Sequence, residues 1–252
     1  MNTKLPSGVP VNGETKLSVI IPAYNENSRI EKTLFAVRKN KKKQSYTYEI
    51  LVVNDGSKDG TADEVKKLAN VIENLKLVDN KENHGKGWVT KQGMLTATGE
   101  VRLFMDADNS TAVDEVAKML PFFENGYDIV VGSRRIEGSN ITVEQSRVRD
   151  FLVGVFRLIV HTLVPVGVTD TQCGFKAFSA KAAQNIFPKQ TIFRWAFDVE
   201  ILSLARKSGY KIKEVPITWI NDAQSHVKLS GMINMLFEVL QIRINLWTGK
   251  YK

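Results

Sequence analysis

The chain has 252 residues, of which 43% are hydrophobic, and a formal net charge of +8. This length suits one large α/β domain or two small ones with a sizeable buried core. The single cysteine, Cys173, excludes an internal disulfide, and the net charge favours an anionic partner, although solubility alone would also account for it.

The N-terminal residues 1–16 are polar and contain Pro and Gly, so we expect a flexible tail and no signal peptide. No stretch reaches the roughly 18–20 apolar residues that span a bilayer. The longest apolar segment, residues 151–168, is interrupted by Arg157, His161 and Pro165. We therefore expect a cytoplasmic protein that is soluble or peripherally associated with a membrane.

Strands and helices are predicted to alternate from residue 17 to residue 133. Apolar runs indicate buried strands at 17–21, 48–54, 75–80, 100–106 and 127–133. Apolar periodicity indicates helices at 28–40, 59–70, 85–98 and 111–125. Such alternation is typical of βαβ units and predicts a largely parallel sheet flanked by helices.

The pattern changes after residue 131. Residues 132–150 are polar, contain four arginines and are predicted to form a mobile loop. Helices are predicted at 149–163 and 197–209, a strand at 210–219 and a final helix at 231–247. For the final helix, packing on the sheet is the simpler interpretation. The functional alternative is an amphipathic helix lying in a membrane surface, with residues 151–160 as a second contact.

Carboxylates follow three of the predicted strands. Glu26 follows the first, Asp55 the second, and Asp106 and Asp108 the fourth. Because ligands of such sheets bind at the carboxyl ends of the strands, we expect these four side chains to converge there. Like charges raise one another's pKa unless a cation lies among them, and Mg²⁺ is typically held by one or two carboxylates with phosphate oxygens. The sequence therefore predicts a divalent cation and a phosphate-bearing ligand at this edge.

Two glycines flank a lysine at the start of a predicted helix, in the sequence NHGKGWVTKQG. The backbone near a helix N-terminus favours anions, and Lys86 adds a point charge between Gly85 and Gly87. The spacing matches neither the dinucleotide-binding pattern nor the P-loop pattern. An ordinary helix entry with an exposed lysine is the simpler alternative.

Seven motifs in chain order resemble those of the family-2 glycosyltransferases. They are LSVIIPAYNE, ILVVNDGSKDGT, NHGKGWVTKQGM, LFMDADNST, VVGSR, DTQCGFKAF and RWAFDVEILSLARKSGYKIKEVPITW. The likeness is greatest to the dolichyl-phosphate (polyprenyl-phosphate) β-glucosyltransferases, followed by the dolichyl-phosphate mannose synthases. It implies a GT-A fold over residues 17–230, with a Rossmann-like, mostly parallel but mixed central sheet, and leaves residues 231–252 as a C-terminal amphipathic helix.

The resemblance also implies a nucleotide-sugar donor, Mg²⁺ or Mn²⁺ as cofactor, an inverted product and roles for individual residues. The base and ribose pocket would be lined by Pro22, Tyr24, Glu26, Val53 and Asp55. Asp106 and Ala107 would contact the nucleotide, and Asp108 would bind the metal and the diphosphate. Mannose synthases place a glutamine ligand two residues after the second aspartate, where this chain has the weaker ligand Ser110. Arg134 would contact the diphosphate or the acceptor phosphate.

A polyprenyl or dolichyl phosphate acceptor is an anion already, so its attack on the sugar needs no strong general base. The requirement is then to stabilise the leaving diphosphate with cations, a role that suits Lys86, Arg134, Arg135, Arg147 and Arg149. We expect Arg147 and Arg149 to bind the acceptor phosphate. They lead into the apolar helix, and the same charges would hold the protein on an anionic membrane.

Other functions remain as alternatives. A hydroxyl acceptor on a glycan or lipid would require a base. The candidate is Asp198, for which a place in the first turn of a helix is the simpler interpretation. A mannosyltransferase using GDP-mannose would keep the same fold. A nucleic-acid-binding protein is disfavoured, because the basic residues are dispersed and the strand ends are acidic. Eukaryotic glucosyltransferases of this type carry an N-terminal membrane anchor, which this sequence lacks, so we expect peripheral association with the cytoplasmic face of a membrane.

Overall fold

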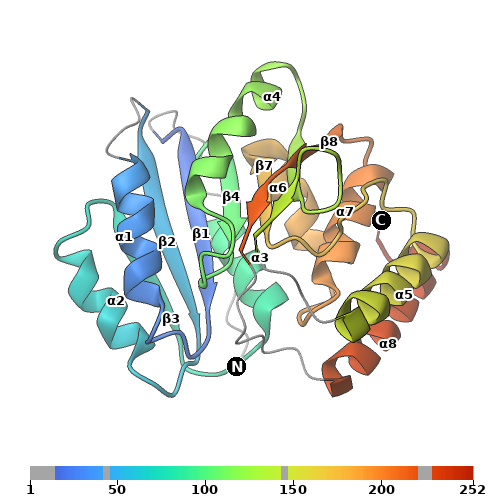
Figure 1. Ribbon diagram of the computed structural model, residues 1–252, viewed down its shortest axis with the longest axis horizontal. Coiled ribbons are helices and arrows are strands. Elements are labelled where there is room, and N and C mark those ends of the chain that lie inside the picture. The colour runs from blue at the N-terminus through green and yellow to red at the C-terminus, as the bar shows by residue number, and fades with distance from the viewer. Residues whose placement is uncertain (1–14, 42–45, 143–146, 221–228, 252) are drawn as a thin grey trace.

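The computed structural model describes residues 15–41, 46–142, 147–220 and 229–251. A seven-stranded sheet forms its centre, with helices on both faces (Figure 1). The strands of this sheet, in chain order, are β1 (Leu17–Ala23), β2 (Tyr48–Asp55), β3 (Leu75–Asn80), β4 (Val101–Met105), β5 (Ile129–Ser133), β7 (Phe175–Ser179) and β8 (Ile212–Pro216).

The sheet is mixed, with spatial order β3-β2-β1-β4-β7-β5-β8. β7 runs antiparallel to its neighbours β4 and β5, whereas the other neighbouring pairs are parallel. The mostly parallel sheet predicted from the sequence is therefore confirmed. β7 was not predicted as a strand, and its insertion next to β4 makes the sheet mixed.

Two apolar layers sandwich the sheet because side chains alternate between its faces. In β1, Val19 and Ile21 belong to one buried cluster and Ile20 to the other. The helices, in chain order, are α1 (Ile30–Lys41), α2 (Thr61–Ala69), α3 (Lys86–Thr96), α4 (Leu120–Glu124), α5 (Arg147–Leu163), α6 (Ala180–Ile186), α7 (Phe197–Lys207) and α8 (Leu229–Trp247). α1 and α2 cover the first face. α3, α6 and α7 cover the second, and α5 and α8 extend that layer.

The single helix predicted at 111–125 is wrong. The segment forms a 3₁₀-helix, η1 (Val113–Lys118), followed by the short α4. Pro121 lies in the first turn of α4. Proline has no backbone N–H to continue a helix, although it is tolerated in a first turn, so a new helix begins there.

The region after β5 is more ordered than the predicted loop. β6 (Asn140–Ile141) pairs with β9 (Thr218–Trp219) in a small parallel second sheet, so the strand predicted at 210–219 is divided between β8 and β9. A short 3₁₀-helix, η2 (Phe187–Lys189), follows α6. α5 begins at Arg147, whereas residues 143–146 lie outside the described residues. Part of the expected mobile loop is therefore strand or helix.

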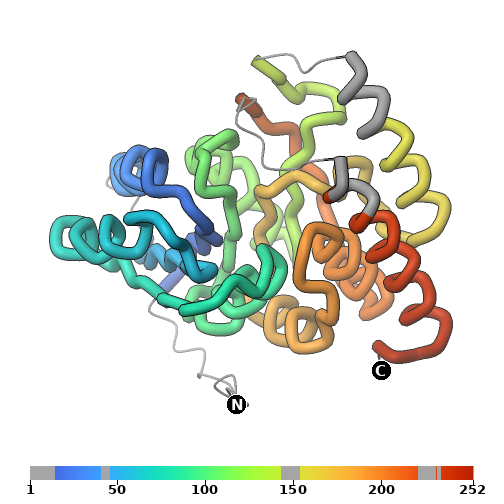
Figure 2. Tube along the Cα trace, turned by 90° about the horizontal axis from the view of Figure 1, so that it is seen from below, coloured from blue at the N-terminus to red at the C-terminus, as the bar shows by residue number. Residues whose placement is uncertain are grey.

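α5 and α8 lie side by side at one end of the molecule (Figures 1 and 2). α8 packs Met235, Val239 and Ile242 into the core, where its main contacts are with α5 and α7 and not with the sheet that the simpler interpretation named. Its other face leaves Phe237 and Trp247 66% and 85% exposed. Within the described residues, no helix combines the length and apolar character needed to cross a membrane.

Candidate active site

Polar side chains gather at the carboxyl edge of the sheet. The ends of β1, β2, β4 and β5 open onto this edge, together with the segment that precedes antiparallel β7. Asp106 and Asp108 follow β4 directly, and α3 begins beside them with Lys86. The topology therefore brings three of the motifs identified in the sequence to one place.

Lys86 and Asp106 form an ion pair between the Nζ and Oδ1 atoms. Burial opposes the charge of Lys86, but neighbouring carboxylates, Asp106 first among them, raise its pKa above the ordinary value. Lys86 is thus a permanent cation at neutral pH. It is not the exposed lysine of the simpler interpretation, because its ammonium group lies against the aspartate pair.

The backbone of Gly174 closes the other side of Asp106. A Cβ atom added to Gly174 would lie 2.1 Å from the Oδ2 atom of Asp106. Only glycine therefore allows the segment before β7 to approach this carboxylate so closely.

We expect Gly174→Ala to reduce kcat/KM by about a hundredfold, because the added methyl group must displace Asp106 from Lys86, and shifts of about 1 Å at a reacting site cost that much. Steady-state kinetics and a thermal melt measure the effect. Gly154→Ala is the matched control, since a Cβ atom there meets nothing within 4 Å. Unchanged kinetics for Gly174→Ala would contradict the role of this contact.

Asp108 is only partly shielded from its acidic neighbour. Burial and the charge of Asp106 raise its pKa, while the Ser110 amide, which donates to the Oδ1 atom at 2.9 Å, and the Ser110 side chain oppose the shift. Asn109 lies between these residues in a left-handed conformation with φ 55°. A tight turn therefore holds two carboxylates and a hydroxyl close together.

The oxygen donors of this turn suit a hard divalent cation. Burial and, after it, the charge of Asp106 raise the pKa of Asp108, and a cation beside this carboxylate would oppose that shift. Among the described residues, however, no group of three or more acidic, histidine or cysteine side chains could together hold a metal. The expected convergence of four carboxylates is therefore wrong, and a cation here would depend on Asp108, Ser110 and the ligand's own oxygens.

Asp55 and Glu26 are engaged elsewhere, which explains that correction. Asp55 is 2% exposed, and its carboxylate accepts hydrogen bonds from the amides of His84 and Gly85 at 2.7 and 3.0 Å. Burial raises its pKa, and these amides partly offset the shift. Glu26 forms an ion pair with Arg29 at 2.6 Å. Asp55 therefore positions the turn before Lys86, and Glu26 lies in the segment before α1, so contacts of either residue with a nucleotide remain predictions.

The remaining residues expected in the nucleotide pocket differ in accessibility. Tyr24 is 43% exposed at the end of β1 and is free to contact a ligand. Pro22, Val53 and Ala107 are buried. The Ala107 carbonyl accepts a hydrogen bond from Thr33 at 2.6 Å. Contacts from Pro22, Val53 and Ala107 to a nucleotide remain predictions that would have to involve their backbone atoms.

Arg134 is held by Asp170, a residue to which the sequence analysis gave no role. Its Nε and Nη2 atoms donate to the two carboxylate oxygens at 2.7 and 2.8 Å, and its guanidinium lies 5.2 Å from the ring centre of Trp219. Burial would raise the pKa of Asp170, but the paired guanidinium lowers it to about 2. Two of the guanidinium nitrogens of Arg134 therefore already donate to Asp170. Contact of Arg134 with a diphosphate remains a prediction.

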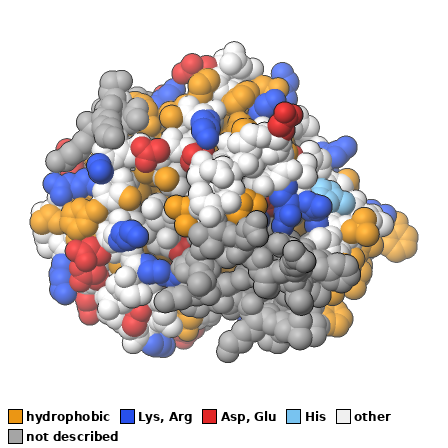
Figure 3. Space-filling model, in the orientation of Figure 1, with side chains coloured by type: hydrophobic (Ala, Val, Ile, Leu, Met, Phe, Trp, Pro, Cys, Tyr) orange, Lys and Arg blue, Asp and Glu red, His pale blue; other side chains and the backbone are white. Residues whose placement is uncertain are grey.

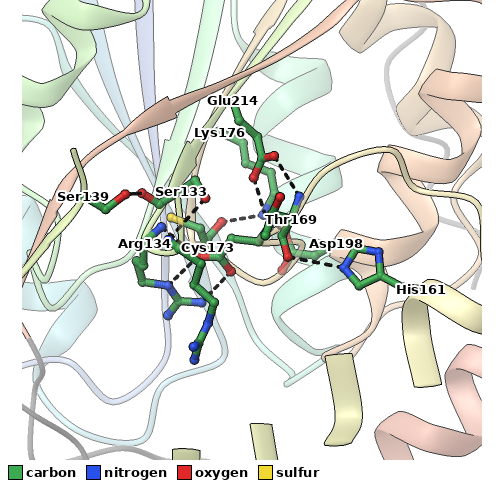
Figure 4. A network of polar contacts seen from close by, with 11 residues as sticks. Ser133, Arg134, Ser139, His161, Thr169, Cys173, Lys176, Asp198 and Glu214 are labelled. Carbon is green, nitrogen blue, oxygen red and sulfur yellow. Dashed lines mark hydrogen bonds and ion pairs between the residues drawn. The ribbon is translucent and has the colours of Figure 1, made fainter. Parts of the chain in front are cut away.

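Lys176 and Asp198 form a second ion pair (Figure 4). The Nζ atom of Lys176, which is 0% exposed, lies 2.5 Å from Asp198 and also donates to the carbonyl of Cys173. Burial raises the pKa of Asp198, and the ammonium group opposes this shift. Asp198 lies in the first turn of α7, as the simpler interpretation expected, but it does not cap the helix. Lys176 had no role in the sequence analysis. Its position between Phe175 and Ala177 in an apolar run could have indicated a buried lysine that needs a carboxylate partner.

The other predicted cations lie around these pairs. Arg135 is exposed, and its amide donates to Ser133 at 3.4 Å. Arg147 and Arg149 belong to the first turns of α5, but their side chains lie outside the described residues. Their contact with an acceptor phosphate remains a prediction.

Comparisons with known proteins agree with this architecture. The model of the family described as Glycosyl transferase family 2 matches residues 18–187. A dolichyl-phosphate beta-glucosyltransferase of Dictyostelium discoideum is 38% identical over 252 residues, which cover 94% of this chain and 76% of that protein.

Two solved structures share the fold. Mannosyl-3-phosphoglycerate synthase from Rubrobacter xylanophilus matches with a TM-score of 0.70 and 18% identity, over 94% of this chain and 75% of that one. Glucosyl-3-phosphoglycerate synthase from Mycobacterium tuberculosis, in complex with Mn²⁺, uridine diphosphate and glucosyl-3-phosphoglycerate, matches with a TM-score of 0.60 and 17% identity, over 92% and 79%. The fold predicted from the sequence is confirmed.

Proposed function

Because the chain belongs to glycosyl transferase family 2, we propose that it transfers glucose from UDP-glucose to a polyprenyl or dolichyl phosphate, with inversion at the sugar C1 atom. The observation that carries this proposal is the cluster of Asp106, Asp108 and Lys86 at the carboxyl edge of the sheet. The relative from Dictyostelium, named for glucosyl transfer to dolichyl phosphate, supports the choice of sugar and acceptor.

The state of Asp198 favours a phosphate acceptor over a hydroxyl. Its carboxylate is 5% exposed and is paired with Lys176, so it is poorly placed to take a proton from an incoming hydroxyl group. A phosphate oxygen is already anionic and attacks C1 without losing a proton. A bond then forms between that oxygen and C1, the bond from C1 to the diphosphate oxygen breaks, and UDP leaves with the electron pair.

The residues of the site would divide the work of binding and charge balance. Lys86 fixes Asp106 for contact with the nucleotide and supplies positive charge near the diphosphate. Mg²⁺ or Mn²⁺, when bound by Asp108 with Ser110 beside it, would neutralise charge developing on the leaving group. Tyr24, which follows β1 and is exposed, would cover the base.

UDP together with Mn²⁺ is expected to raise the melting temperature of the protein. A ligand at about a hundredfold its Kd adds about 2.7 kcal/mol to the free energy of unfolding. Differential scanning fluorimetry with UDP and GDP, followed by a donor screen with a short polyprenyl phosphate, measures this. Stabilisation by GDP and not by UDP would favour the mannosyltransferase alternative, and a better rate with a water-soluble sugar acceptor would favour transfer to a hydroxyl.

Arg147→Ala and Arg149→Ala are expected to raise the KM for polyprenyl phosphate about tenfold and that for UDP-glucose much less. The reason is the loss of one charge-assisted contact to the lipid phosphate. Lys32→Ala is the matched control, because Lys32 is an exposed cation on α1, away from α5 and α8. Equal KM values for the lipid in all three variants and the native chain would contradict this assignment.

Peripheral association with the cytoplasmic face of an anionic membrane is part of the proposal. Exposed apolar side chains recur along one face of α8, at Phe237, Leu240, Ile244 and Trp247. This spacing is that of a helix lying in a membrane surface.

The end of the catalytic domain predicted at residue 230 also remains a proposal. α8 lies beyond that boundary for most of its length, and it packs into the same core.

A further inference from the structure

A polar pocket lies beside α5, between this helix, the loop that follows it and the end of α7. It has a volume of about 490 Å³. The residues around it are Arg157, His161, Val164, Pro165, Val166, Gly167, Val168, Thr169 and Arg206. None of the roles derived above uses this pocket.

The two permanently charged side chains that line this pocket are both arginines, Arg157 and Arg206. Arg157 and His161 lie one helical turn apart on α5, and Arg206 reaches in from α7. No carboxylate is among the lining residues, and no ion pair of either guanidinium is recorded in the described part of the chain. The nearby Glu214 carboxylate accepts hydrogen bonds from the amides of Thr169 and Asp170 at 2.8 and 3.0 Å, so it is engaged by the backbone.

The loop itself is shaped to accommodate a guanidinium and an anion. Gly167 has φ 75°, and a Cβ atom added to it would lie 2.9 Å from the Nη1 atom of Arg206. The guanidinium therefore lies against the loop backbone. Among the described residues, no hydrogen bond is recorded from the amides of Val166, Gly167 or Val168. Successive amides without partners are donors for an anion.

The surroundings connect the pocket to the surface and to the active site. Leu158, 68% exposed, is next to Arg157 on α5. The visible face in Figure 3 has Lys, Arg and His side chains next to hydrophobic ones near the end formed by α5 and α8. The His161 ring contacts the carbonyl of Thr169 at 3.3 Å (Figure 4). Thr169 precedes Asp170, which holds Arg134.

We propose that this pocket, lined by Arg157, His161 and Arg206, is a binding site for a phosphate group separate from the donor and acceptor sites. Arginine forks match phosphate oxygens with two parallel hydrogen bonds, and the absence of a lining carboxylate leaves the positive charge unbalanced. The phosphate belongs to an anionic phospholipid head group or to a small soluble phosphate compound. Both present the same oxygens.

The test uses the full-length protein with inorganic phosphate and with vesicles of phosphatidylcholine, with or without phosphatidic acid. NMR titration follows the imidazole signals of His161, and cosedimentation follows the vesicles. Arg157→Gln and Arg206→Gln should each weaken phosphate binding about tenfold, because one charge-assisted contact is lost. Lys32→Gln, which removes an exposed cation of α1 outside the pocket and outside the proposed membrane surface, should leave it unchanged.

The outcomes distinguish a lipid head group from a soluble phosphate compound, and this pocket from the proposed active site. If the same two variants also lose binding to vesicles with phosphatidic acid, the ligand is a lipid head group. If they lose only inorganic phosphate, it is a soluble phosphate compound. Glucosyl transfer in detergent should persist in both variants, so a failure of the proposed function would appear separately as no transfer by the native chain. Phosphate and vesicle binding equal to that of Lys32→Gln in both variants overturns the proposal.

Discussion

Asp108→Asn is expected to lower glycosyl transfer by at least about a thousandfold while leaving the protein folded. The carboxylate is the only acidic group of its turn besides Asp106, and stabilisation of a leaving diphosphate is among the largest contributions to such catalysis. Transfer should also disappear in EDTA and return with Mn²⁺ or Mg²⁺. Steady-state kinetics with each metal measures both effects.

The stability of this variant follows from the sign of the pKa shift. Burial and Asp106 raise the pKa of Asp108 in the folded protein. Below the ordinary pKa of aspartate, Asp108 is protonated in the folded and the unfolded chain and does not affect stability. Above its raised pKa, the ionised carboxylate destabilises the fold. At neutral pH without metal, Asp108→Asn removes this cost, and its melting temperature should equal or exceed that of the native chain.

Asp63→Asn is the control, because Asp63 is an exposed carboxylate on α2, with a side chain 78% exposed. It should change neither turnover nor the melting temperature. Full turnover by metal-free protein in EDTA, or near-native activity of Asp108→Asn, would exclude Asp108 as a cation ligand.

Lys176→Met is expected to lower the free energy of unfolding by about 3–5 kcal/mol at neutral pH. The substitution removes the cation that lies 2.5 Å from Asp198 and leaves that carboxylate buried without it. Removal of one partner of a buried pair has this cost because the remaining charge is not solvated. Denaturant unfolding of the native chain and the variant measures the difference.

The pH dependence identifies the cause. Burial already raises the pKa of Asp198, and loss of Lys176 should raise it further. Protonation of Asp198 removes the cost of its buried charge. The difference in the free energy of unfolding between the variant and the native chain should therefore become smaller as the pH is lowered from neutral. The double variant Lys176→Met, Asp198→Asn should regain at least half of the lost stability, because it leaves no buried unpaired carboxylate.

Lys181→Met serves as the control, since Lys181 is exposed on α6 and such substitutions stay within about 0.5 kcal/mol. The loss in the free energy of unfolding could instead be independent of pH and unchanged in the double variant. Lost packing of the lysine side chain, and not the charge of Asp198, would then be the cause of the destabilisation.

The positions of the site motifs were predictable because they depend on local sequence. Asp106 and Asp108 follow an apolar strand, and Lys86 opens a helix, so the rule that parallel strands bind ligands at their carboxyl ends placed them together. The same reasoning overestimated the acidity of the site. A strand end indicates where a carboxylate lies, but it does not indicate whether a nearby amide or arginine already binds it.

Asp55 illustrates the difference. Its place at the end of β2 was correctly predicted, yet its carboxylate is used by the turn at His84 and Gly85, 29 and 30 residues further along the chain. Arg134 was likewise expected to face a ligand, and its partner Asp170 is 36 residues away. Neither separation has a periodicity that a sequence pattern could reveal.

The alternation of strands and helices, the family and the place of the motifs at the carboxyl ends of strands could be predicted from the chain, because each depends on hydrophobic periodicity or on short motifs. The pairing of charges became visible in the folded protein. The insertion of β7 between β4 and β5 brings Lys176 into the sheet, and α7 brings Asp198 to meet it. A buried charge is stable only beside a partner, and the partner is determined by distance in space, which the folded sheet creates between residues far apart in the chain.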